Sequence, residues 1–230
     1  MRPDKRYRRA ERFAIFGHRG SPKRHPENTL ASFDEALRAG ADGFETDLRL
    51  LSDGTAVLFH DDEIDGIEVE TLTAAQVEER GGVAERVSAL SRYAGRAQMI
   101  LEVKRAGWED ALIAQISAWP GIVVASFDHS LLLSLHERGV PFPLGITFHG
   151  SLVDVGAYAE KLGATWCFPN HRFVDEAMVR ALHERGILIV PWTVNQPHEW
   201  QRLDDAGCDG MMTDLPHDAV VWRGAMEAED

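Results

Sequence analysis

Residues 13–61 read FAIFGHRGSPKRHPENTLASFDEALRAGADGFETDLRLLSDGTAVLFHD, and they alternate short apolar runs with polar turns. The polar clusters HRG, PEN, ETD and HD stand where a strand would end and a loop begin. Strands that are buried on both faces read as short apolar runs, and α/β folds place their ligand sites at the carboxyl ends of such strands. We therefore expect this stretch to hold most of an active site.

The same unit of helix and strand recurs along the chain. At Gly40, Gly139 and Gly186 a helical window ends in glycine, which closes a helix in a left-handed conformation, and a short apolar run follows. Residues 39–48, AGADGFETDL, are echoed by residues 206–215, AGCDGMMTDL, either through an old duplication or through one αβ turn found twice. The eight predicted strands are Phe13–Phe16, Gly43–Arg49, Gln98–Val103, Ile122–Ser126, Leu144–Thr147, Thr165–Phe168, Ile187–Thr193 and Gly210–Thr213.

Eight strands with helices between them predict an α/β fold, a closed parallel (β/α)8 barrel of the TIM type in a single domain. The expected helices include Asn28–Ala39, Ser130–Arg138, Leu152–Leu162, Asp175–Glu184 and Glu199–Asp205. A further run, Ala56–Phe59, follows a hairpin-type turn and is expected to pair with the second strand outside the barrel. A doubly wound open sheet is the alternative, but it needs a glycine-rich phosphate turn after the first strand, and GHRGSP is not that turn.

Composition limits the possible partners. The chain has 230 residues, is 44% hydrophobic and carries a formal net charge of −13, which argues against nucleic acid and anionic membranes. No apolar run approaches the roughly 20 residues of a membrane helix. Cys167 and Cys208 lie far apart without ligand-type spacing, so we expect two core residues in a reducing, cytoplasmic compartment.

The expected organisation is one barrel domain at residues 13–222 between two short charged ends. Residues 1–12 are a basic lead-in, and the apolar run after them is too short for a secretory signal. Residues 223–230 are an acidic tail.

Acidic side chains cluster on two predicted strands. Glu45 and Asp47 are two residues apart, so both carboxylates point to the same face of their strand, and Glu102 and Lys104 share a face in the same way. Charges inside a barrel are costly unless they are paired or bound to a metal. Three converging carboxylates would form a hard oxygen site for Ca²⁺ or Mg²⁺. The alternative is a salt bridge of Lys104 to one of these acids, with no metal.

Two histidines each end a predicted strand and can overhang one rim. His18 and His60 are suited to general base and general acid, unless each only caps its strand by bonding to the backbone. Arg19 offers a planar fork for phosphate and Lys104 a point charge, so an anionic substrate remains possible in this acidic protein.

These residues carry a family resemblance. The segments HRGSPKRHPENTLASFDEAL, GADGFETDLRLLSDGTAVLFHD, ILEVK, WTVN and GCDGMMTDLP occur in this order and resemble the glycerophosphodiester phosphodiesterase family over nearly the whole chain. The resemblance implies a TIM barrel. It also implies hydrolysis of glycerophosphodiesters, such as glycerophosphocholine or glycerophosphoethanolamine, to glycerol 3-phosphate and an alcohol.

The resemblance also assigns roles. His18 and His60 match the family's acid/base pair, and a divalent ion, Mg²⁺ or Ca²⁺, falls on Glu45, Asp47 and Glu102. Arg19 and Lys104 match phosphate-binding positions, and Trp192 lines the substrate pocket unless it is a plain core residue. The supporting positions are Glu27, Asn28 and Asp61. We expect His18 to be the base and His60 the acid, with the attacking oxygen either a glycerol hydroxyl of the substrate or water.

The chain departs from the family after His60-Asp61, where it reads DEIDGIEVETLTAAQVEERGGVAERVSAL and lacks a Leu-x-Arg-Thr-Thr-like run. The matched catalytic positions remain, so the departure bears on substrate range. Two alternatives follow: a lysophospholipase D-type enzyme acting on lysolipids, which needs an apolar entrance, and a barrel that binds a phosphorylated ligand without cleaving it.

Overall fold

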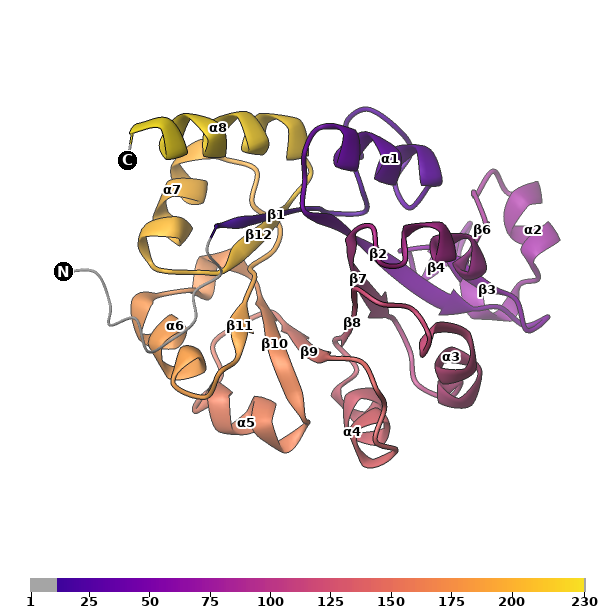
Figure 1. Cartoon of the computed structure of the whole chain (residues 1–230). Coiled ribbons are helices and arrows are strands. Elements are labelled where there is room, and N and C mark those ends of the chain that lie inside the picture. The colour runs from indigo at the N-terminus through magenta and orange to yellow at the C-terminus, as the bar shows by residue number, and fades with distance from the viewer. Residues whose placement is uncertain (1–11, 230) are drawn as a thin grey trace.

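The computed structural model describes residues 12–229, and its parallel strands follow one another around a common axis with the helices outside (Figure 1). In the hydrogen-bonded order the first seven barrel strands lie beside their neighbours in the chain, and the eighth strand returns to pair with the first. The eight barrel strands are β1 (Ala14–Gly17), β2 (Gly43–Leu50), β7 (Gln98–Val103), β8 (Ile122–Ser126), β9 (Leu144–Phe148), β10 (Ala164–Pro169), β11 (Leu188–Ile189) and β12 (Gly210–Thr213). The predicted TIM-type barrel is confirmed, and the doubly wound alternative is wrong.

The seam between β11 and β12 is irregular. The strand predicted over Ile187–Thr193 forms a ladder only over Leu188–Ile189. Pro191 has no N–H to donate, so a regular ladder cannot continue through it. The barrel nevertheless closes, because Asp209 N donates to Ile189 O at 3.0 Å and Met212 N donates to Pro191 O at 2.8 Å.

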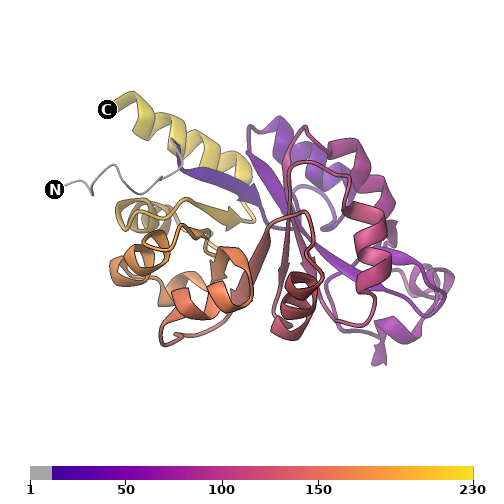
Figure 2. The same cartoon turned by 60° about the horizontal axis from the view of Figure 1, so that its bottom comes forward.

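The helices surround the strands (Figure 2). All five helical windows named from the sequence are present, and α2, α3 and α8 add to them. Thr29 caps the first helix by accepting from Ser32 N, and Asp175 caps α6 by accepting from Met178 N. The helices are α1 (Leu30–Arg38), α2 (Ala74–Glu79), α3 (Glu109–Ile116), α4 (His129–Glu137), α5 (Val155–Lys161), α6 (Glu176–His183), α7 (Pro197–Asp205) and α8 (Pro216–Glu229).

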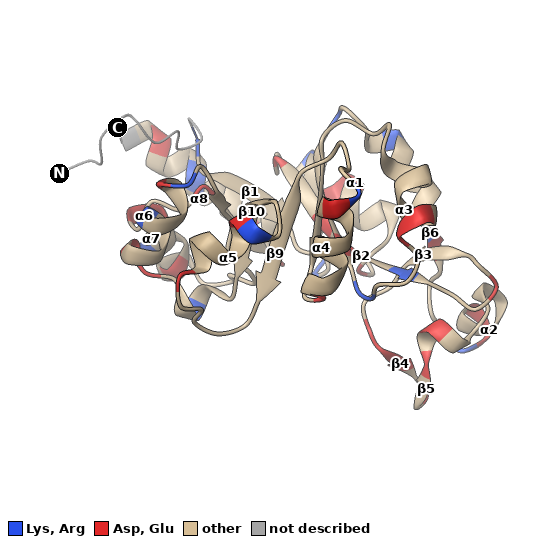
Figure 3. Cartoon of the chain, turned by 90° about the horizontal axis from the view of Figure 1, so that it is seen from below, with Lys and Arg blue, Asp and Glu red and all other residues tan. Residues whose placement is uncertain are grey.

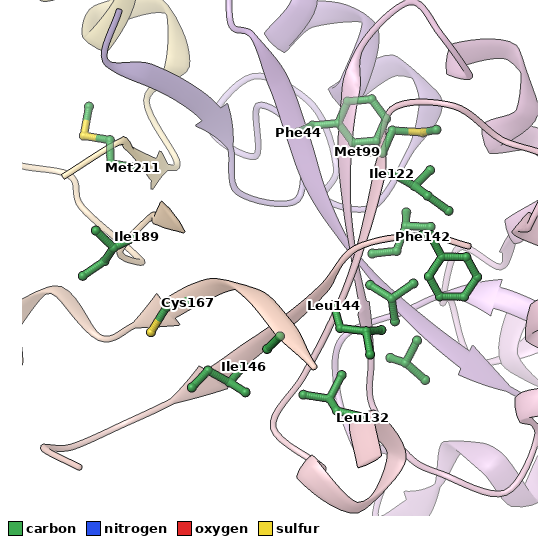
Figure 4. Close-up of a cluster of buried hydrophobic side chains, with 14 of the residues drawn as sticks. Phe44, Met99, Ile122, Leu132, Phe142, Leu144, Ile146, Cys167, Ile189 and Met211 are labelled. Carbon is green, nitrogen blue, oxygen red and sulfur yellow. The ribbon is translucent and has the colours of Figure 1, made fainter. Parts of the chain in front are cut away.

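Apolar side chains fill two layers, because successive side chains of a strand point to opposite faces. The outer layer lies between strands and helices and includes Phe44, Ile146 and Met211 (Figure 4). Cys167 and Cys208 belong to this outer layer, as expected. The inner layer lies inside the barrel and contains Phe16, Ile100, Val123, Ala125, Phe168, Val190 and Met212.

One excursion leaves the barrel between β2 and β7. Strand β3 (Ala56–Leu58) pairs antiparallel with the end of β2, as predicted, and then with β6 (Glu85–Arg86). The acidic segment after His60 forms a hairpin of β4 (Glu63–Ile64) and β5 (Ile67–Glu68), which projects from the body and carries acidic side chains (Figure 3). Three 3₁₀ turns complete the elements: η1 (Val69–Thr71), η2 (Val87–Tyr93) and, after β10, η3 (His171–Phe173).

Residues near the two ends of the described chain converge on Asp42 at the start of the barrel. Of the predicted basic lead-in, residues 1–11 lie outside the described residues, whereas Arg12 pairs with Asp42 at 3.2 Å. Helix α8 runs through the boundary that the sequence analysis drew at residue 222, and the buried Arg223 donates to Phe13 O and pairs with Asp42. No helix among residues 12–229 is long and apolar enough to cross a membrane.

Candidate active site

A cavity of about 160 Å³ opens at the carboxyl ends of the barrel strands. Its wall brings together every residue that the sequence analysis assigned to catalysis, metal or phosphate, together with Trp192. The lining residues are His18, Arg19, Glu45, Asp47, His60, Ile100, Glu102, Lys104, Ala125, Phe127, Thr147, Trp192 and Met212. The supporting residues Glu27, Asn28 and Asp61 are not in the wall and instead hold residues that are.

Three carboxylates converge inside the wall. Glu45 and Asp47 share the inner face of β2, and the parallel pairing of β2 with β7 sets Asp47 opposite Glu102. One oxygen atom from each lies within 4.8 Å of the others, and all three side chains are buried. Burial, with Asp47 and Glu102 close by, raises the pKa of Glu45 well above its usual range, and burial with Asp47 raises the pKa of Glu102.

Lys104 neutralises part of this charge. Its ammonium lies 2.6 Å from Asp47 Oδ1 and also pairs with Glu102. Burial alone would raise the pKa of Asp47, but Lys104 and Arg19 outweigh it and lower the pKa to about 2. The salt bridge considered as an alternative to a metal is therefore present, to two acids at once. Of the described lysines and arginines, only Lys104 and Arg19 offset the three buried carboxylates, and Arg19 also pairs with Glu27, so the triad keeps a deficit of positive charge that fits a hard divalent ion.

Asn28 fixes Asp47 from the loop after β1. Its side-chain amide donates to Asp47 Oδ2 at 2.8 Å, while its carbonyl oxygen accepts from Thr46 Oγ1 at 2.8 Å and from Asp47 N at 3.2 Å. The backbone of Asn28 is left-handed, with φ of 56°, a conformation that asparagine tolerates better than most residues. The PEN turn therefore orients one acid of the triad.

The turn that carries His18 and Arg19 is tight. A Cβ on Gly17 would lie 2.2 Å from Gly20 O, so only glycine fits there. Arg19 has φ of 55°, its N–H donates to Glu45 Oε2 at 3.0 Å, and its guanidinium donates to both oxygens of Glu27 at 2.9 and 3.0 Å. Arg19 Nε has no hydrogen-bond partner among the described residues and lies 3.4 Å from Asp47 Oδ2.

His18 has a carboxylate partner that the sequence analysis missed. His18 Nδ1 lies 2.8 Å from Asp214 Oδ1, and Asn195 Nδ2 donates to Asp214 Oδ2 at 2.7 Å. Burial alone would raise the pKa of Asp214, but the bond to His18 lowers it below its usual range. Because an ionised carboxylate only accepts, Nδ1 carries the proton and Nε2 is the acceptor, with the Thr193 hydroxyl 3.5 Å away and Glu45 Oε2 4.0 Å away. Asp214 and Asn195 lie in the segments GCDGMMTDLP and WTVN, which resemble the family, so their position in these segments could have indicated a role at the site.

His60 is held differently. Its Nδ1 lies 2.8 Å from Asp61 Oδ1, and Asp61 is exposed. Its backbone carbonyl accepts from Arg49 Nη2 at 2.7 Å. Arg49 is buried and also pairs with Asp62 at 2.6 Å and with Glu70, so the hairpin after β3 is tied to the strand that carries the acids.

The opposite wall of the cavity is mainly apolar. Trp192 packs edge-on against Phe127, with ring centroids 5.4 Å apart, and its Nε1 donates to Phe168 O at 2.8 Å. Trp192 lies in the cavity wall and is partly exposed, so it is not a plain core residue. Phe127 is 47% exposed at the same wall. The cavity thus has a charged half and an apolar half.

Comparison with known proteins agrees with this geometry. The sequence model of the glycerophosphoryl diester phosphodiesterase family matches residues 18–109 and 91–218, which together span most of the chain. A glycerophosphodiester phosphodiesterase of Caldanaerobacter subterraneus is 27% identical over 90% of this chain and 96% of its own. One of Bacillus altitudinis is 28% identical, over 93% and 99%.

Solved structures share the fold. The glycerophosphodiester phosphodiesterase of Thermotoga maritima superposes with a TM-score of 0.80 at 25% identity, covering 92% of this chain and 98% of that one. An Oleispira antarctica phosphodiesterase, solved in complex with its product sn-glycerol-3-phosphate, superposes with a TM-score of 0.80 at 23% identity over 91% and 96% of the two chains.

Proposed function

This chain belongs to the glycerophosphoryl diester phosphodiesterase family and is a phosphoric diester hydrolase, and from that premise we propose its reaction. It hydrolyses glycerophosphodiesters, such as glycerophosphocholine or glycerophosphoethanolamine, to sn-glycerol 3-phosphate and an alcohol. The observation that carries the proposal is the meeting of two histidines, two cations and three buried carboxylates in the wall of one cavity.

Glu45, Asp47 and Glu102 would hold a divalent cation, Mg²⁺ or Ca²⁺. When bound, the ion supplies Lewis-acid stabilisation of the charge that builds on the phosphoryl oxygens. Arg19 and Lys104 bind the phosphoryl group from the protein side, and an all-oxygen donor set favours hard cations such as Mg²⁺ and Ca²⁺.

His18 is the general base. Asp214 accepts from Nδ1 of His18, which orients Nε2 toward the cavity as a proton acceptor. His18 takes the proton of the attacking oxygen. If that oxygen is a hydroxyl of the substrate's glycerol, the first product is a cyclic phosphate, which water opens to glycerol 3-phosphate in a second step with the roles of the two histidines exchanged; if it is water, glycerol 3-phosphate forms directly. His60, oriented in turn by Asp61 at its Nδ1, protonates the leaving alkoxide as the general acid.

Replacement of either histidine tests these roles. We expect His18→Ala and His60→Ala to lower the turnover of glycerophosphocholine by about 10²–10⁴-fold while the far-ultraviolet spectrum stays unchanged. His217→Ala, in a half-exposed histidine of α8, is the matched control and should retain full activity. Near-wild-type turnover in both site variants would overturn the assignment.

One observation favours a second substrate class. Phe127 is exposed at the edge of the apolar half of the cavity, which is the apolar entrance that a lysolipid requires. A series of glycerophosphocholines with no acyl chain, or with acyl chains of increasing length on the glycerol, separates the two: rising kcat/KM with length indicates a lysophospholipase D-type enzyme, and falling kcat/KM indicates small polar substrates. Binding without turnover across the series would instead indicate a non-catalytic barrel.

A further inference from the structure

Thr147 has a buried side-chain hydroxyl that no other described residue hydrogen-bonds. The residue is 3% exposed, and its hydroxyl oxygen has no hydrogen-bond partner among the described residues. Buried hydroxyls are rarely left unpaired, because burial removes the hydrogen bonds that the hydroxyl makes with water. An unpaired buried hydroxyl in a native protein therefore points to a hydrogen-bond partner outside the protein, such as a bound ligand.

The side chain of Thr147 faces the cavity. On β9, Leu144, Ile146 and Phe148 pack into the outer layer against the helices, so Thr147 points inward by the alternation of the strand. It lies in the wall of the cavity, in the apolar half, beside Phe127 and Trp192. There it is the one side chain with a hydroxyl among the lining residues.

The backbone of Thr147 is fixed from outside the barrel. His129 Nε2 lies 2.9 Å from Thr147 O, and His129 Nδ1 lies 2.9 Å from the Tyr158 hydroxyl. A carbonyl oxygen only accepts, so Nε2 donates to it. Threonine is also branched at Cβ and has few side-chain rotamers. The hydroxyl is consequently held at a defined place before any ligand arrives.

From these observations we infer that Thr147 binds one hydroxyl of the substrate's glycerol group and selects for it. This inference rests on the proposed function, which supplies a substrate with a glycerol group. The apolar side chains around Thr147 suit the carbon chain of glycerol, and its single unpaired hydroxyl suits one hydroxyl on that chain. Thr147 is a specificity residue and moves no proton.

The test measures how tightly the reaction product and its analogues bind, and not how fast substrate is turned over. Wild type, Thr147→Val and Thr147→Ser are titrated calorimetrically, at one fixed Mg²⁺ concentration, with glycerol 3-phosphate and with two analogues, 2-hydroxypropyl phosphate and 3-hydroxypropyl phosphate, that each lack one hydroxyl. We expect Thr147→Val to bind glycerol 3-phosphate about 2–10-fold more weakly than wild type, the effect of one hydrogen bond. One analogue should bind wild type and Thr147→Val equally, and Thr147→Ser should restore most of the preference.

A second measurement separates a ligand contact from a structural role. Valine has the shape of threonine without the hydroxyl, so Thr147→Val should melt at the wild-type temperature or slightly above it. A fall of several degrees would show that the hydroxyl has a structural partner and would overturn the inference. So would equal weakening of all three ligands, or wild-type binding of glycerol 3-phosphate by Thr147→Val.

The proposed function can fail separately. If wild type hydrolyses glycerophosphocholine and Thr147→Val keeps full affinity for glycerol 3-phosphate, only the role of Thr147 is wrong. If wild type neither hydrolyses any glycerophosphodiester nor binds glycerol 3-phosphate, the proposed function and the role of Thr147 are both wrong.

Discussion

Asn28 and Asn195 hold two aspartates in the same way on the two sides of β1. Asn28 donates to Asp47 and accepts from Asp47 N and Thr46 Oγ1, on β2. Asn195 donates to Asp214 at 2.7 Å and accepts from Asp214 N at 2.9 Å and from the Thr213 hydroxyl at 3.1 Å, at the end of β12. One aspartate then serves the acidic triad and the other serves His18.

The equivalence extends to the start of both strands. Asp42 Oδ2 accepts from Ile15 N at 2.8 Å, and Asp209 Oδ2 accepts from Ile189 N at 2.8 Å. The segments AGADGFETDL and AGCDGMMTDL are thus similar in their hydrogen bonds as well as in their sequence. The two segments differ at one position whose side chain points into the barrel, where Glu45 of the first corresponds to Met212 of the second.

Asp214→Asn should reverse the tautomer of His18. The side-chain oxygen of the new asparagine must still accept from Asn195, so its amide would face His18 Nδ1 and force the proton onto Nε2. We expect kcat for glycerophosphocholine to fall about 10²-fold or more, because the base can then no longer accept a proton. Asp218→Asn, in an exposed acid of α8, is the control. Full activity of Asp214→Asn would contradict the role of Asp214.

A divalent ion should stabilise the fold through the acidic triad. Protein stripped with a chelator should melt at a higher temperature once Mg²⁺ or Ca²⁺ is added, since a ligand at 100 times its dissociation constant stabilises the native state by about 2.7 kcal/mol. Glu45→Gln should lose most of this shift, whereas Glu176→Gln, in an exposed acid of α6, should keep it. An equal shift in Glu45→Gln and wild type would place the ion elsewhere.

Arg49→Met should destabilise the protein by about 3–5 kcal/mol in urea unfolding, because it leaves Glu70 without its buried cationic partner. The carbonyl of His60 loses its donor in the same variant, so kcat should fall as well. Arg105→Met is the control: Arg105 is half exposed and also pairs with acids of this excursion, and its loss should cost no more than about 1 kcal/mol. Wild-type stability of Arg49→Met would refute the role of Arg49.

Asp128 should contribute stability that depends on pH. Its carboxylate caps α4 by accepting from Ser130 N and Leu131 N. Partial burial opposes the effect, but hydrogen bonds from Ser130, Ala106 and Leu131 hold the pKa of Asp128 below its usual range. A lowered pKa means that the stabilisation is complete above the ordinary value near 4 and disappears as pH falls through the folded value.

Asp128→Ala should therefore cost about 1 kcal/mol at pH 7, and the gap to wild type should narrow below pH 4. Urea unfolding at pH 7, 4 and 3 measures this difference in unfolding free energy, and Asp218→Ala is the exposed control. A gap that stays constant over this range would show that the charge of Asp128 does not matter.

The barrel and the acidic triad could be predicted from the sequence because both follow from local periodicity. The spacing of Glu45 and Asp47 fixes a shared face, and the register of neighbouring parallel strands brings Glu102 to them. Buried strands separated by helices leave few other architectures. The limits of β11 could not be predicted, because the apolar pattern of Ile187–Thr193 continues through Pro191, where the ladder stops.

Long-range polar contacts could not be predicted in this way. Asp214 is 196 residues from His18 along the chain, and only the closure of the barrel brings them together. Arg49 appears in the sequence as one more charge in a strand, and nothing local shows that it is buried against Glu70. Thr147 stands in an apolar run, where its unpaired hydroxyl becomes visible only once the neighbouring side chains are placed.

The two halves of the cavity come from two parts of the chain. All the charged lining residues lie between His18 and Lys104, and the apolar half, with Thr147, comes almost entirely from residue 125 onward. Divergence of the later strands and loops can therefore change which glycerol-side group the apolar half accepts while the bond-breaking groups stay as they are. A chimera with a relative, joined in the exposed turn at residues 105–107, would exchange specificity alone, provided that it keeps Asn195 and Asp214 for His18.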